Sequence, residues 1–469
     1  MKKNLFFSVL FFAAASLFAQ NDEQADLAQA AETGGDSPKT AVPVKTLTID
    51  EAVSLAIVQN LNLEAVGIGT ETKKRAADFA WNNFLPTVGF SGGLSAANTA
   101  PKALALTPSG PTMAEGSRWT MNGALQIQWQ GLNIAMIEGI KKIREDYTVG
   151  ALSFQKAKIQ LEREIRKLYL QILLLEENLK VQEQNLQLAE QNFKMSDSRY
   201  RAGLSSELTL LQARVDRDRL IPAVNQVNDN IKIARANLAV QLGLPYDTEF
   251  KLMSVDLGNF DVSLDVQELI AKAAGNKPDI MELQANITAT KSARTALALQ
   301  TWTPNLNIGW NVTPTNSDPF GSTSTWTDRG SLSLSLNWAL NGLLPFTKEG
   351  NAIKNMDDTL KTLDINLAQM IRGAEVEVYN TVFTINQARS SAETQQKTVD
   401  LAQRTYELTS QAFQAGLTEL LQLSNAQNQL SQAQVGVLQQ RFNFLIGIID
   451  LEYAIGAPFG TLMKKQSAN

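Results

Sequence analysis

Residues 119–130 read Trp119-Thr-Met-Asn-Gly-Ala-Leu-Gln-Ile-Gln-Trp-Gln130, with apolar and polar side chains alternating along almost the whole stretch. A period of two residues predicts a β-strand with one apolar and one polar face. The polar face carries hydroxyl and amide groups but no Lys, Arg, Asp or Glu, which a soluble half-buried sheet normally places there. Strands of about 9–11 residues with this pattern are typical of a transmembrane β-barrel.

Three further segments alternate in the same way, the last of them more weakly: 331–340, 305–313 and 87–94. Pro86 and Pro304 directly precede two of them, and we expect each proline to mark a junction between helix and strand. All seven Trp residues lie in or beside the four segments. We expect an aromatic girdle at the membrane interfaces formed by Trp119, Trp129, Trp302, Trp310 and Trp338. The alternative is a soluble sheet with one buried face.

Four strands cannot close a sheet within one chain. A sheet edge in hydrocarbon leaves backbone N–H and C=O groups unsatisfied, so a membrane sheet must close on itself. Known outer-membrane barrels begin at eight strands, and four per chain therefore require several chains. A dimer gives eight strands and a trimer twelve. Three or more copies are favoured if the lumen is open, because the side chains of an eight-stranded barrel fill its interior.

A different period follows the strands. From Leu161 to Phe193, core positions recur at alternating spacings of four and three residues, the 3.5-residue repeat of coiled coils. No Gly or Pro lies between Leu161 and Tyr200. If the helix begins near Ile134, its ~67 residues extend for roughly 100 Å. The same register returns with smaller side chains from Ala374 to Tyr406, so we predict two very long helices, each followed by a returning helix.

The chain contains two copies of one unit. Ala202-Gly203-Leu204 recurs as Ala415-Gly416-Leu417, and Leu242-Gly243-Leu244-Pro245 recurs as Ile455-Gly456-Ala457-Pro458, both 213 residues later. Internal similarity at a fixed offset indicates a repeat architecture. The predicted organisation is repeat 1 over 46–245, a linker over 246–262, repeat 2 over 263–460 and a C-terminal tail over 461–469.

The N-terminus carries a targeting pattern. Met1-Lys2-Lys3 precedes an apolar run from Leu5 to Phe18, which is too short for a membrane helix and typical of a secretory signal peptide. We expect a signal peptide over 1–19, with an uncleaved anchor as the alternative. The stretch 20–45 is rich in Ala, Asp, Glu, Gly and Pro without periodicity, and we expect it to be mobile.

Composition excludes several classes of function. The chain of 469 residues has no His and no Cys, which removes Ser-His-Asp triads, Cys nucleophiles and thiolate metal sites. Its net charge of −5 argues against a nucleic-acid partner. The acidic side chains lie scattered along helix faces without a convergent motif, so we expect no enzyme. A non-transporting coiled-coil protein of the envelope explains the helices but not the uncharged, Trp-flanked strands, and it is the alternative.

The residues around the two glycine turns carry a resemblance. Arg199-Tyr200-Arg201-Ala202-Gly203 is followed by Leu210-Leu211-Gln212-Ala213, and Phe413-Gln414-Ala415-Gly416 is followed by Leu420-Leu421. The order of helix, Pro-led strand, strand, long helix, glycine turn and helix occurs twice after a signal peptide. In these features the chain resembles the TolC-type outer-membrane factors, also called outer membrane efflux proteins, over residues 46–460.

The resemblance implies a fold that is mainly α with membrane β. Two tandem repeats of long coiled-coil helices plus two strands each form, in a homotrimer, a 12-stranded β-barrel continuous with a periplasmic α-helical barrel. The implied function is the outer-membrane exit duct of a tripartite efflux or type I secretion system, which passively conducts substrate from an inner-membrane pump to the exterior. The implied partners are a periplasmic adaptor protein, a pump of the RND, ABC or MFS class and outer-membrane lipid, with no cofactor and no metal.

The resemblance also implies roles at the periplasmic tip. The implied adaptor contacts are Gly203, Leu204, Gly416 and Leu417, with packing inside the turns as the alternative for the two leucines. Well-known relatives carry carboxylates six and nine residues after the second turn glycine. The corresponding residues here are neutral: Thr209 and Gln212 in the first repeat, and Gln422 and Asn425 in the second.

The nearest acidic side chains at the two turns are Glu207 and Glu419. In a trimer, three copies of each would form a ring that attracts cations if they point inward. The alternative is an acid at a helix N-terminus, which the helix dipole stabilises. These two acids and the four neutral residues are the candidates for the pore constriction.

Overall fold

The computed structural model describes residues 45–108, 110–131, 133–254, 264–321, 324–338, 340, 344 and 346–464. The predicted signal peptide and nearly all of the segment 20–45 lie outside these residues. The chain divides into two compact units, Met1–Thr46 with Glu249–Lys251, and Leu47–Thr248 with Leu252–Asn469. Of the first unit the structure describes Lys45, Thr46 and Glu249–Lys251. The strands β1 (Lys45–Leu47) and β6 (Phe250–Leu252) pair in a two-stranded sheet.

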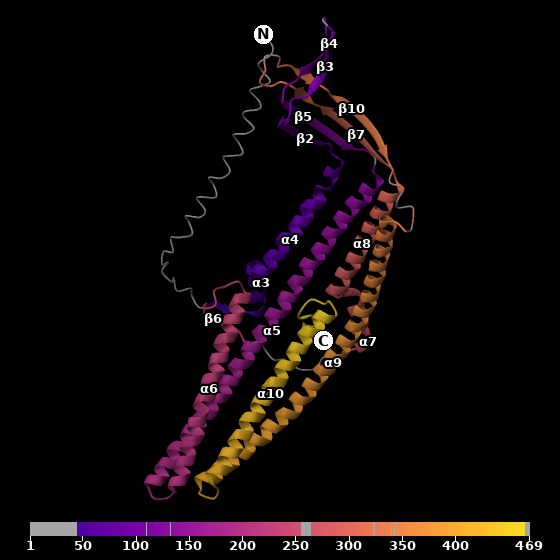
Figure 1. Cartoon of the computed structure of the whole chain (residues 1–469). Coiled ribbons are helices and arrows are strands. Elements are labelled where there is room, and N and C mark those ends of the chain that lie inside the picture. Colours follow the sequence, from indigo (N-terminus) through magenta and orange to yellow (C-terminus); the bar gives the residue numbers. More distant parts are fainter. Residues whose placement is uncertain are drawn as a thin grey trace. The chain divides into compact units, whose positions relative to one another are not determined.

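Apart from η1 in the first series, the second unit contains the same order of elements twice (Figure 1). The first series is α3 (Ile49–Gln59), α4 (Leu61–Asp78), η1 (Ala80–Phe84), β2 (Thr87–Ala96), β3 (Lys102–Thr107), β4 (Gly110–Glu115), β5 (Trp119–Gln130), α5 (Ile134–Arg201) and α6 (Glu207–Gln241). The second is α7 (Val266–Asn276), α8 (Pro278–Trp302), β7 (Asn305–Val312), β8 (Pro314–Asn316), β9 (Trp326–Asp328), β10 (Ser331–Asn337), α9 (Lys348–Gln414) and α10 (Leu420–Ala454), and α11 (Thr461–Lys464) follows.

Polar side chains define where the helices begin. Thr48 and Glu51 form a reciprocal capping box at the start of α3, with each side chain accepting the other residue's backbone N–H. Asn60 separates α3 from α4, and its Oδ1 accepts the N–H of Leu63 at 3.0 Å. Thr347 caps α9 in the same manner by accepting the N–H of Gly350. These caps satisfy backbone donors that the first helical turn leaves without a partner.

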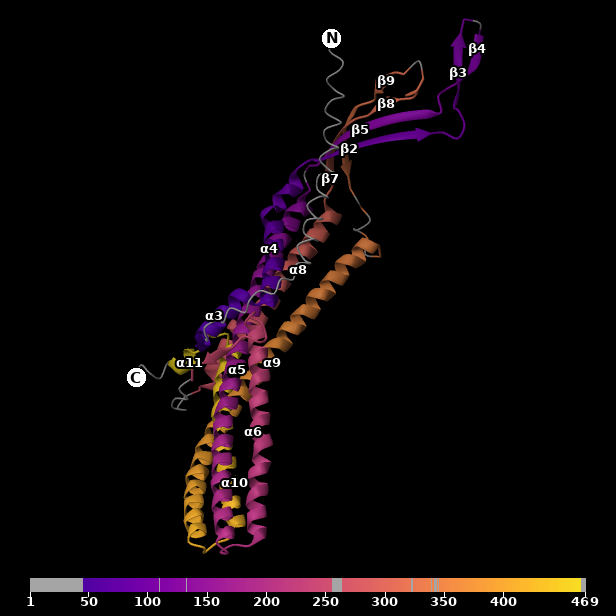
Figure 2. The ribbon, with the colours of Figure 1, turned by 90° about the vertical axis from the view of Figure 1, so that its left-hand side faces the viewer.

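The two very long helices are present as predicted. α5 has 68 residues and α9 has 67, which correspond to about 100 Å each at ~1.5 Å per residue. α5 packs against α6 and α10, and α10 packs against α9 (Figure 2). Ala374, Val378 and Ile385 are among the predicted core positions of the second copy that are buried, and Ile165 and Ile172 are among those buried in the first copy. The predicted core positions of both copies that are not buried are half-buried. The 3.5-residue period therefore identifies the faces that meet within one chain.

The four predicted strands lie in one antiparallel sheet of six strands, in which they are arranged in the order β2–β5–β7–β10 and β8 also pairs with β5. Val88 lies opposite Ile127, Ile127 lies opposite Trp310, and Trp310 lies opposite Leu332. Because side chains alternate between faces, this register puts the apolar residues of all four strands on one face. The polar side chains share the other face.

Two short hairpins were not expected from the sequence. β3 pairs with β4 between β2 and β5, and β8 pairs with β9 between β7 and β10. The strand Lys102–Thr107 alternates leucine with alanine, so its contrast between faces is too low for a strand pattern to stand out. Pro and Gly in Gly110–Glu115 weaken the signal further.

Among the described residues, no single helix meets the length and hydropathy required to cross a membrane. The helices Ile49–Gln59 and Leu61–Phe84, bent by 50° at their break, meet these requirements only as a pair.

Candidate functional site

The two glycine turns have the same backbone conformation. Gly203 has φ +71° and Gly416 has φ +75°, a left-handed region that favours glycine. The N–H of Leu204 donates to the carbonyl of Arg199, and the N–H of Leu417 donates to the carbonyl of Ala412, both at 2.8 Å. This 6→1 bond closes a Schellman motif at the end of each long helix. The motif leaves Leu204 79% exposed and Leu417 82% exposed.

The two turns lie together at one end of the long helices (Figure 1). Phe413 of α9 is buried in a cluster with Ala213 of α6 and with Leu420 and Leu423 of α10. Arg199 Nη2 donates to the main-chain carbonyl of Gln414 at 2.6 Å, and the guanidinium lies 5.0 Å from the centroid of the Phe413 ring. The end of the first long helix is thus bound to the end of the second.

The candidate constriction residues all lie at the start of the two returning helices, within their first two turns or directly before them. Glu207 begins α6 and Glu419 directly precedes α10. In the single chain Thr209 is half-buried. The other five candidates are exposed: Glu207, Gln212, Glu419, Gln422 and Asn425. The hydroxyl of Thr418 donates to Oε1 of Gln422. Their exposure is compatible with a lumen-facing position.

Four of the five girdle tryptophans lie at strand ends. Trp119 and Trp129 bracket β5, Trp302 ends α8 shortly before β7, and Trp338 directly follows β10. The indole Nε1 of Trp129 donates to the carbonyl of Phe84 at 2.9 Å. Trp310 differs, because it lies inside β7. Pro86 and Pro304 immediately precede β2 and β7.

A second pair of glycines explains the repeated Leu-Gly-Leu-Pro motif. Gly243 and Gly456 have φ +75° and +64° and follow α6 and α10. A Cβ on Gly243 would lie 2.2 Å from the carbonyl oxygen of Gln59, and one on Gly456 would lie 2.2 Å from that of Asn276. Each turn therefore packs its backbone against the end of the first helix in its own repeat. The recurrence of the motif in the sequence identifies the two turns, but it does not predict which helix each turn contacts.

Ion pairs join the two repeats along α5. Lys156 Nζ lies 2.9 Å from Asp279 Oδ1 and 2.9 Å from Glu282 Oε2, both on α8. Burial lowers the pKa of Lys156, but the hydrogen bonds and charges of the two carboxylates outweigh it and raise that pKa above its ordinary value. Arg163 Nε donates to Asp450 Oδ1 of α10 at 2.8 Å. Sequence reasoning missed these pairs because their partners lie more than 100 residues apart.

A buried amide pair also links the repeats nearer the tip. Gln427 of α10 donates from Nε2 to the carbonyl oxygen of Asn185 of α5 at 2.8 Å and to its Oδ1 at 2.5 Å. Both residues are buried. A satisfied polar pair in an apolar seam fixes the register of the two helices.

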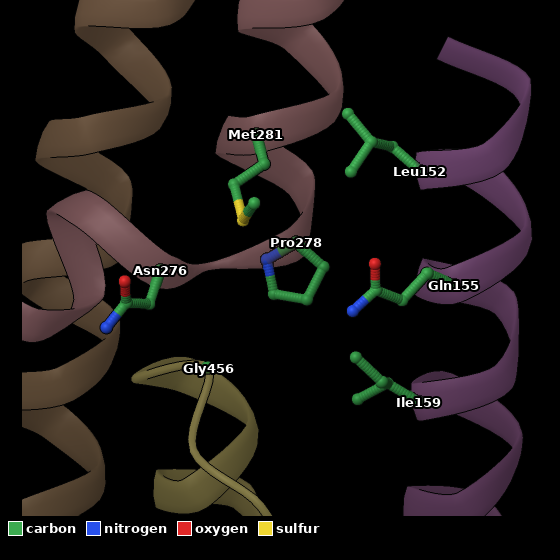
Figure 3. A pocket seen from close by; sticks show the side chains of 7 residues that line it. All are labelled: Leu152, Gln155, Ile159, Asn276, Pro278, Met281 and Gly456. Atoms are coloured by element: carbon green, nitrogen blue, oxygen red, sulfur yellow. The ribbon is translucent and has the colours of Figure 1, made fainter. Parts of the chain in front are cut away.

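A cavity of about 210 Å³ is lined by residues of α5, α7, α8 and the Gly456 turn (Figure 3). Leu152, Gln155 and Ile159 of α5 face Pro278 and Met281 of α8 across it. The volume is below the ~300 Å³ at which pockets for drug-sized ligands begin. Among the described residues, no three His, Cys, Asp or Glu side chains are grouped so as to hold a metal ion.

Comparison with known proteins agrees with this geometry. The sequence model of the family Outer membrane efflux protein matches residues 52–244 and again residues 269–457. Toxin and drug export protein A of Aggregatibacter actinomycetemcomitans is 21% identical over 414 residues, which cover 86% of this chain and 84% of that protein.

Solved structures share the fold. The outer membrane protein VceC of Vibrio cholerae aligns with a TM-score of 0.70 at 14% identity, covering 88% of this chain and 96% of VceC. The CmeC outer membrane channel of Campylobacter jejuni aligns with a TM-score of 0.70 at 15% identity, covering 89% and 88% of the two chains. With the family model matched twice, this chain belongs to the outer membrane efflux protein family and is an exit duct of the outer membrane that extends into the periplasm.

Proposed function

We propose that three copies of this chain share one 12-stranded barrel and one helical tunnel, and that the duct receives substrate from an inner-membrane pump through a periplasmic adaptor. The observation that carries the proposal is that the two outer strands of the sheet each have an unpaired edge. In the described sheet, β2 pairs only with β5 and β10 pairs only with β7. An apolar sheet in lipid cannot keep such edges open, so β10 of one copy pairs with β2 of the next.

The exposed apolar face of the sheet supports a position in lipid. Val88, Phe90, Leu332 and Leu334 are each more than 60% exposed in the single chain. Exposed contiguous apolar surface of this extent marks a membrane or protein interaction site. The tryptophans at the strand ends fit the headgroup level, where their rings prefer to lie.

The helices also have faces that one chain does not cover. Large apolar side chains at helical spacing are exposed on α6: Leu208, Leu211, Val215, Ile221, Ile233 and Val240. A comparable set is exposed on α9: Ile365, Val376, Tyr379, Phe383, Leu401 and Leu408. Because these two helices differ, packing α6 of one copy on α9 of the next is a head-to-tail contact, the kind of contact that forms a ring when its rotation closes.

The tip is the proposed contact with the adaptor and pump. Gly203 and Gly416 hold Leu204 and Leu417 outward, where they present apolar side chains that no other part of the described chain covers. The relative from Aggregatibacter is named for export of toxins and drugs. We propose the same broad role here, with an RND, ABC or MFS pump as its source of substrate and no catalytic activity of the chain itself.

Two measurements on the purified protein test the proposal. Unheated protein in detergent is expected to migrate as a trimer that heating converts to monomer, and planar bilayers are expected to show ion conductance. The competing function, a non-transporting envelope coiled coil, predicts no conductance and no dependence on detergent. A monomer in dilute buffer without detergent would contradict the proposed assembly.

A further inference from the structure

The apolar face of the sheet continues beyond the long strands into the hairpin β8–β9. β8 keeps the register that β7 has with β5, and β9 keeps the register that β10 has with β7. Met121 of β5 lies opposite Asn316 of β8, which lies opposite Trp326 of β9. Because directly opposite residues share a face, Trp326 lies on the face of Met121 and Trp119. This end of the sheet lies away from the helices (Figure 2).

The length of the strand β9–β10 locates the outer edge of the membrane band. Trp338 directly follows β10 near the helices, and Asp328 ends β9 ten residues earlier. Ten residues at ~3.3 Å each, tilted by about 40°, rise about 25 Å, the height of the apolar band of an outer-membrane barrel. Asp328 is exposed on the face of Trp326, where a carboxylate is costly in hydrocarbon. Asp328 therefore marks the level of the headgroups, and Trp326 lies beyond it.

A buried amide fixes the loop that follows β8. Asn316 is 2% exposed, and its Nδ2 donates to Ser324 Oγ at 2.7 Å. Its Oδ1 accepts the backbone N–H of Asp318 at 3.0 Å. Both bonds of this side chain are thus made to the loop, one where the loop leaves β8 and one where it returns toward β9.

The loop adds a third aromatic ring to the two tryptophans. The rings of Phe320 and Trp119 meet edge to face, with their centroids 5.7 Å apart. Phe320 is 72% exposed, Trp326 50% and Trp119 43%. Trp119 and Trp326 lie two strands and two residues apart, about 12 Å between their Cα atoms, a spacing that a sugar ring can bridge. We name Trp119, Phe320 and Trp326 the Trp326 cluster.

Exposed aromatic rings beside a carboxylate suit a sugar. The C–H groups on one face of a pyranose are weakly positive and stack on the negative face of an aromatic ring. The hydroxyl groups at its edge donate to a carboxylate such as that of Asp328. An acyl chain cannot make these hydrogen bonds, and a lipid phosphate is repelled by the carboxylate.

We propose that the Trp326 cluster and Asp328 bind the sugar headgroup of a glycolipid in the outer leaflet of the outer membrane. The helices extend into the periplasm, so this end of the sheet faces the exterior. The proposal rests on the position of the sheet in lipid proposed above. A glycolipid is favoured over a free glycan because the cluster lies on the lipid-facing side, where a lipid holds its headgroup at high local concentration. All four residues belong to one chain, so the site needs no second copy.

The test measures lipid binding to the purified full-length protein in lauryldimethylamine oxide, a detergent without a sugar. Glucosyl dioleoylglycerol and dioleoylglycerol are titrated separately, and native mass spectrometry counts the bound molecules. The glycolipid is expected to saturate a single site per chain and to bind roughly 5-fold or more tightly than dioleoylglycerol. Phe320→Ala and Trp326→Ala should each raise the apparent Kd of the glycolipid by roughly the same factor. Trp338→Ala, the control at the opposite end of the sheet, should leave it unchanged.

Equal binding of the two lipids overturns the proposal, as does a Phe320→Ala protein that binds the glycolipid like the wild type. If Trp326→Ala does not fold, Phe320→Ala, a change at an exposed loop residue, still decides. Methyl glucoside carries the sugar without the lipid, and binding as tight as that of the glycolipid would show a site for free glycans and overturn the assignment to a lipid. A protein that stays in solution without detergent contradicts the proposed membrane position instead. The two failures are therefore distinguishable.

Discussion

Arg199 at the end of the first long helix and Gln414 at the end of the second are joined by a hydrogen bond of 2.6 Å from guanidinium to main-chain carbonyl. The same guanidinium lies over the ring of Phe413. Because the two residues belong to different repeats, the bond ties the two tip hairpins of one chain together. It must break or move if the hairpins separate.

Replacing Arg199 is expected to loosen the tip. Arg199→Ala removes a charged hydrogen bond and a cation–π contact, together about 1–2 kcal/mol at a site that is partly solvated. That is roughly a 10-fold shift toward open states, measured as open probability in planar bilayers. Arg199→Lys should recover only part of the effect, because lysine lacks the planar group that stacks on Phe413.

The matched control is Arg201→Ala. Arg201 pairs with Asp197 on its own helix at 2.9 Å and is largely exposed, so its loss should leave open probability near the wild-type value. Equal effects of the two alanine variants would show that the bond from Arg199 to Gln414 does not hold the tip.

The four left-handed glycines that recur between the two repeats should respond differently to alanine. Gly203→Ala and Gly416→Ala meet no atom within 4 Å, so they cost only backbone strain, about 1–2 kcal/mol. Gly243→Ala and Gly456→Ala add a clash with the carbonyl of Gln59 or Asn276 and should cost considerably more. The yield of heat-resistant trimer and its melting temperature measure the difference. Comparable losses at all four glycines would contradict the described packing.

Glu452 is expected to give the protein a pH-dependent stability. Its carboxylate is buried and accepts the N–H groups of Gly460 and Leu462, both at 2.8 Å. Burial raises the pKa of Glu452 above its ordinary value of 4.5, although these hydrogen bonds and the charge of Arg166 oppose the rise. The folded chain then keeps this proton at pH values where the unfolded chain has lost it. The contribution of Glu452 to the free energy of unfolding therefore falls as the pH rises from 4.5 through the raised pKa.

Glu452→Gln removes this titration. Relative to the variant, the wild type should lose stability as the pH increases across that window, measured as the midpoint of urea unfolding. Glutamine also turns an NH₂ group toward a backbone N–H, which costs about 1–3 kcal/mol at every pH. The exposed Glu164→Gln serves as the control. A wild-type to variant difference that is independent of pH would contradict the shifted titration.

The acids at the tip are expected to bind cations. Three copies each of Glu207 and Glu419 would give the constriction a negative ring, and trivalent cations should then block single-channel current at micromolar concentration. Glu419→Gln should abolish the block, and Gln422→Ala, a neutral change on the same turn, should retain it. Wild-type current that trivalent cations leave unchanged would identify both acids as solvated helix termini.

The local pattern of apolar and polar residues was sufficient to predict many of the strands and helices. Strict alternation in Trp119–Gln130 and Ser331–Asn337 predicted strands, and the 3.5-residue period predicted α5 and α9. The strand Lys102–Thr107 was not predicted, because leucine and alanine differ too little to mark two faces.

Contacts between residues far apart in the chain could not be predicted from a single sequence. The sequence places Arg199 four residues before the Gly203 turn but does not identify its partner, because that partner lies 215 residues away and is a backbone carbonyl that any residue would supply. Trp310 was predicted to belong to the aromatic girdle because it is a tryptophan. Its position inside β7, away from the strand ends, depends on how β5, β7 and β10 pair. Register is a property of the assembled sheet and has no local sequence signal of comparable strength.

The central claim, that several copies share one barrel wall, is tested most directly by disulfide crosslinking between the two edge strands. The natural chain has no cysteine. One cysteine replaces Gly89 or Ser91 on β2 and a second replaces Ser333 or Ser335 on β10. Because the proposed contact joins different edges, each single-cysteine variant should stay uncrosslinked. Oxidation of at least one double variant in outer membranes should give covalent dimers and trimers on denaturing gels and no larger species, whereas monomer alone in all four combinations would contradict the shared barrel.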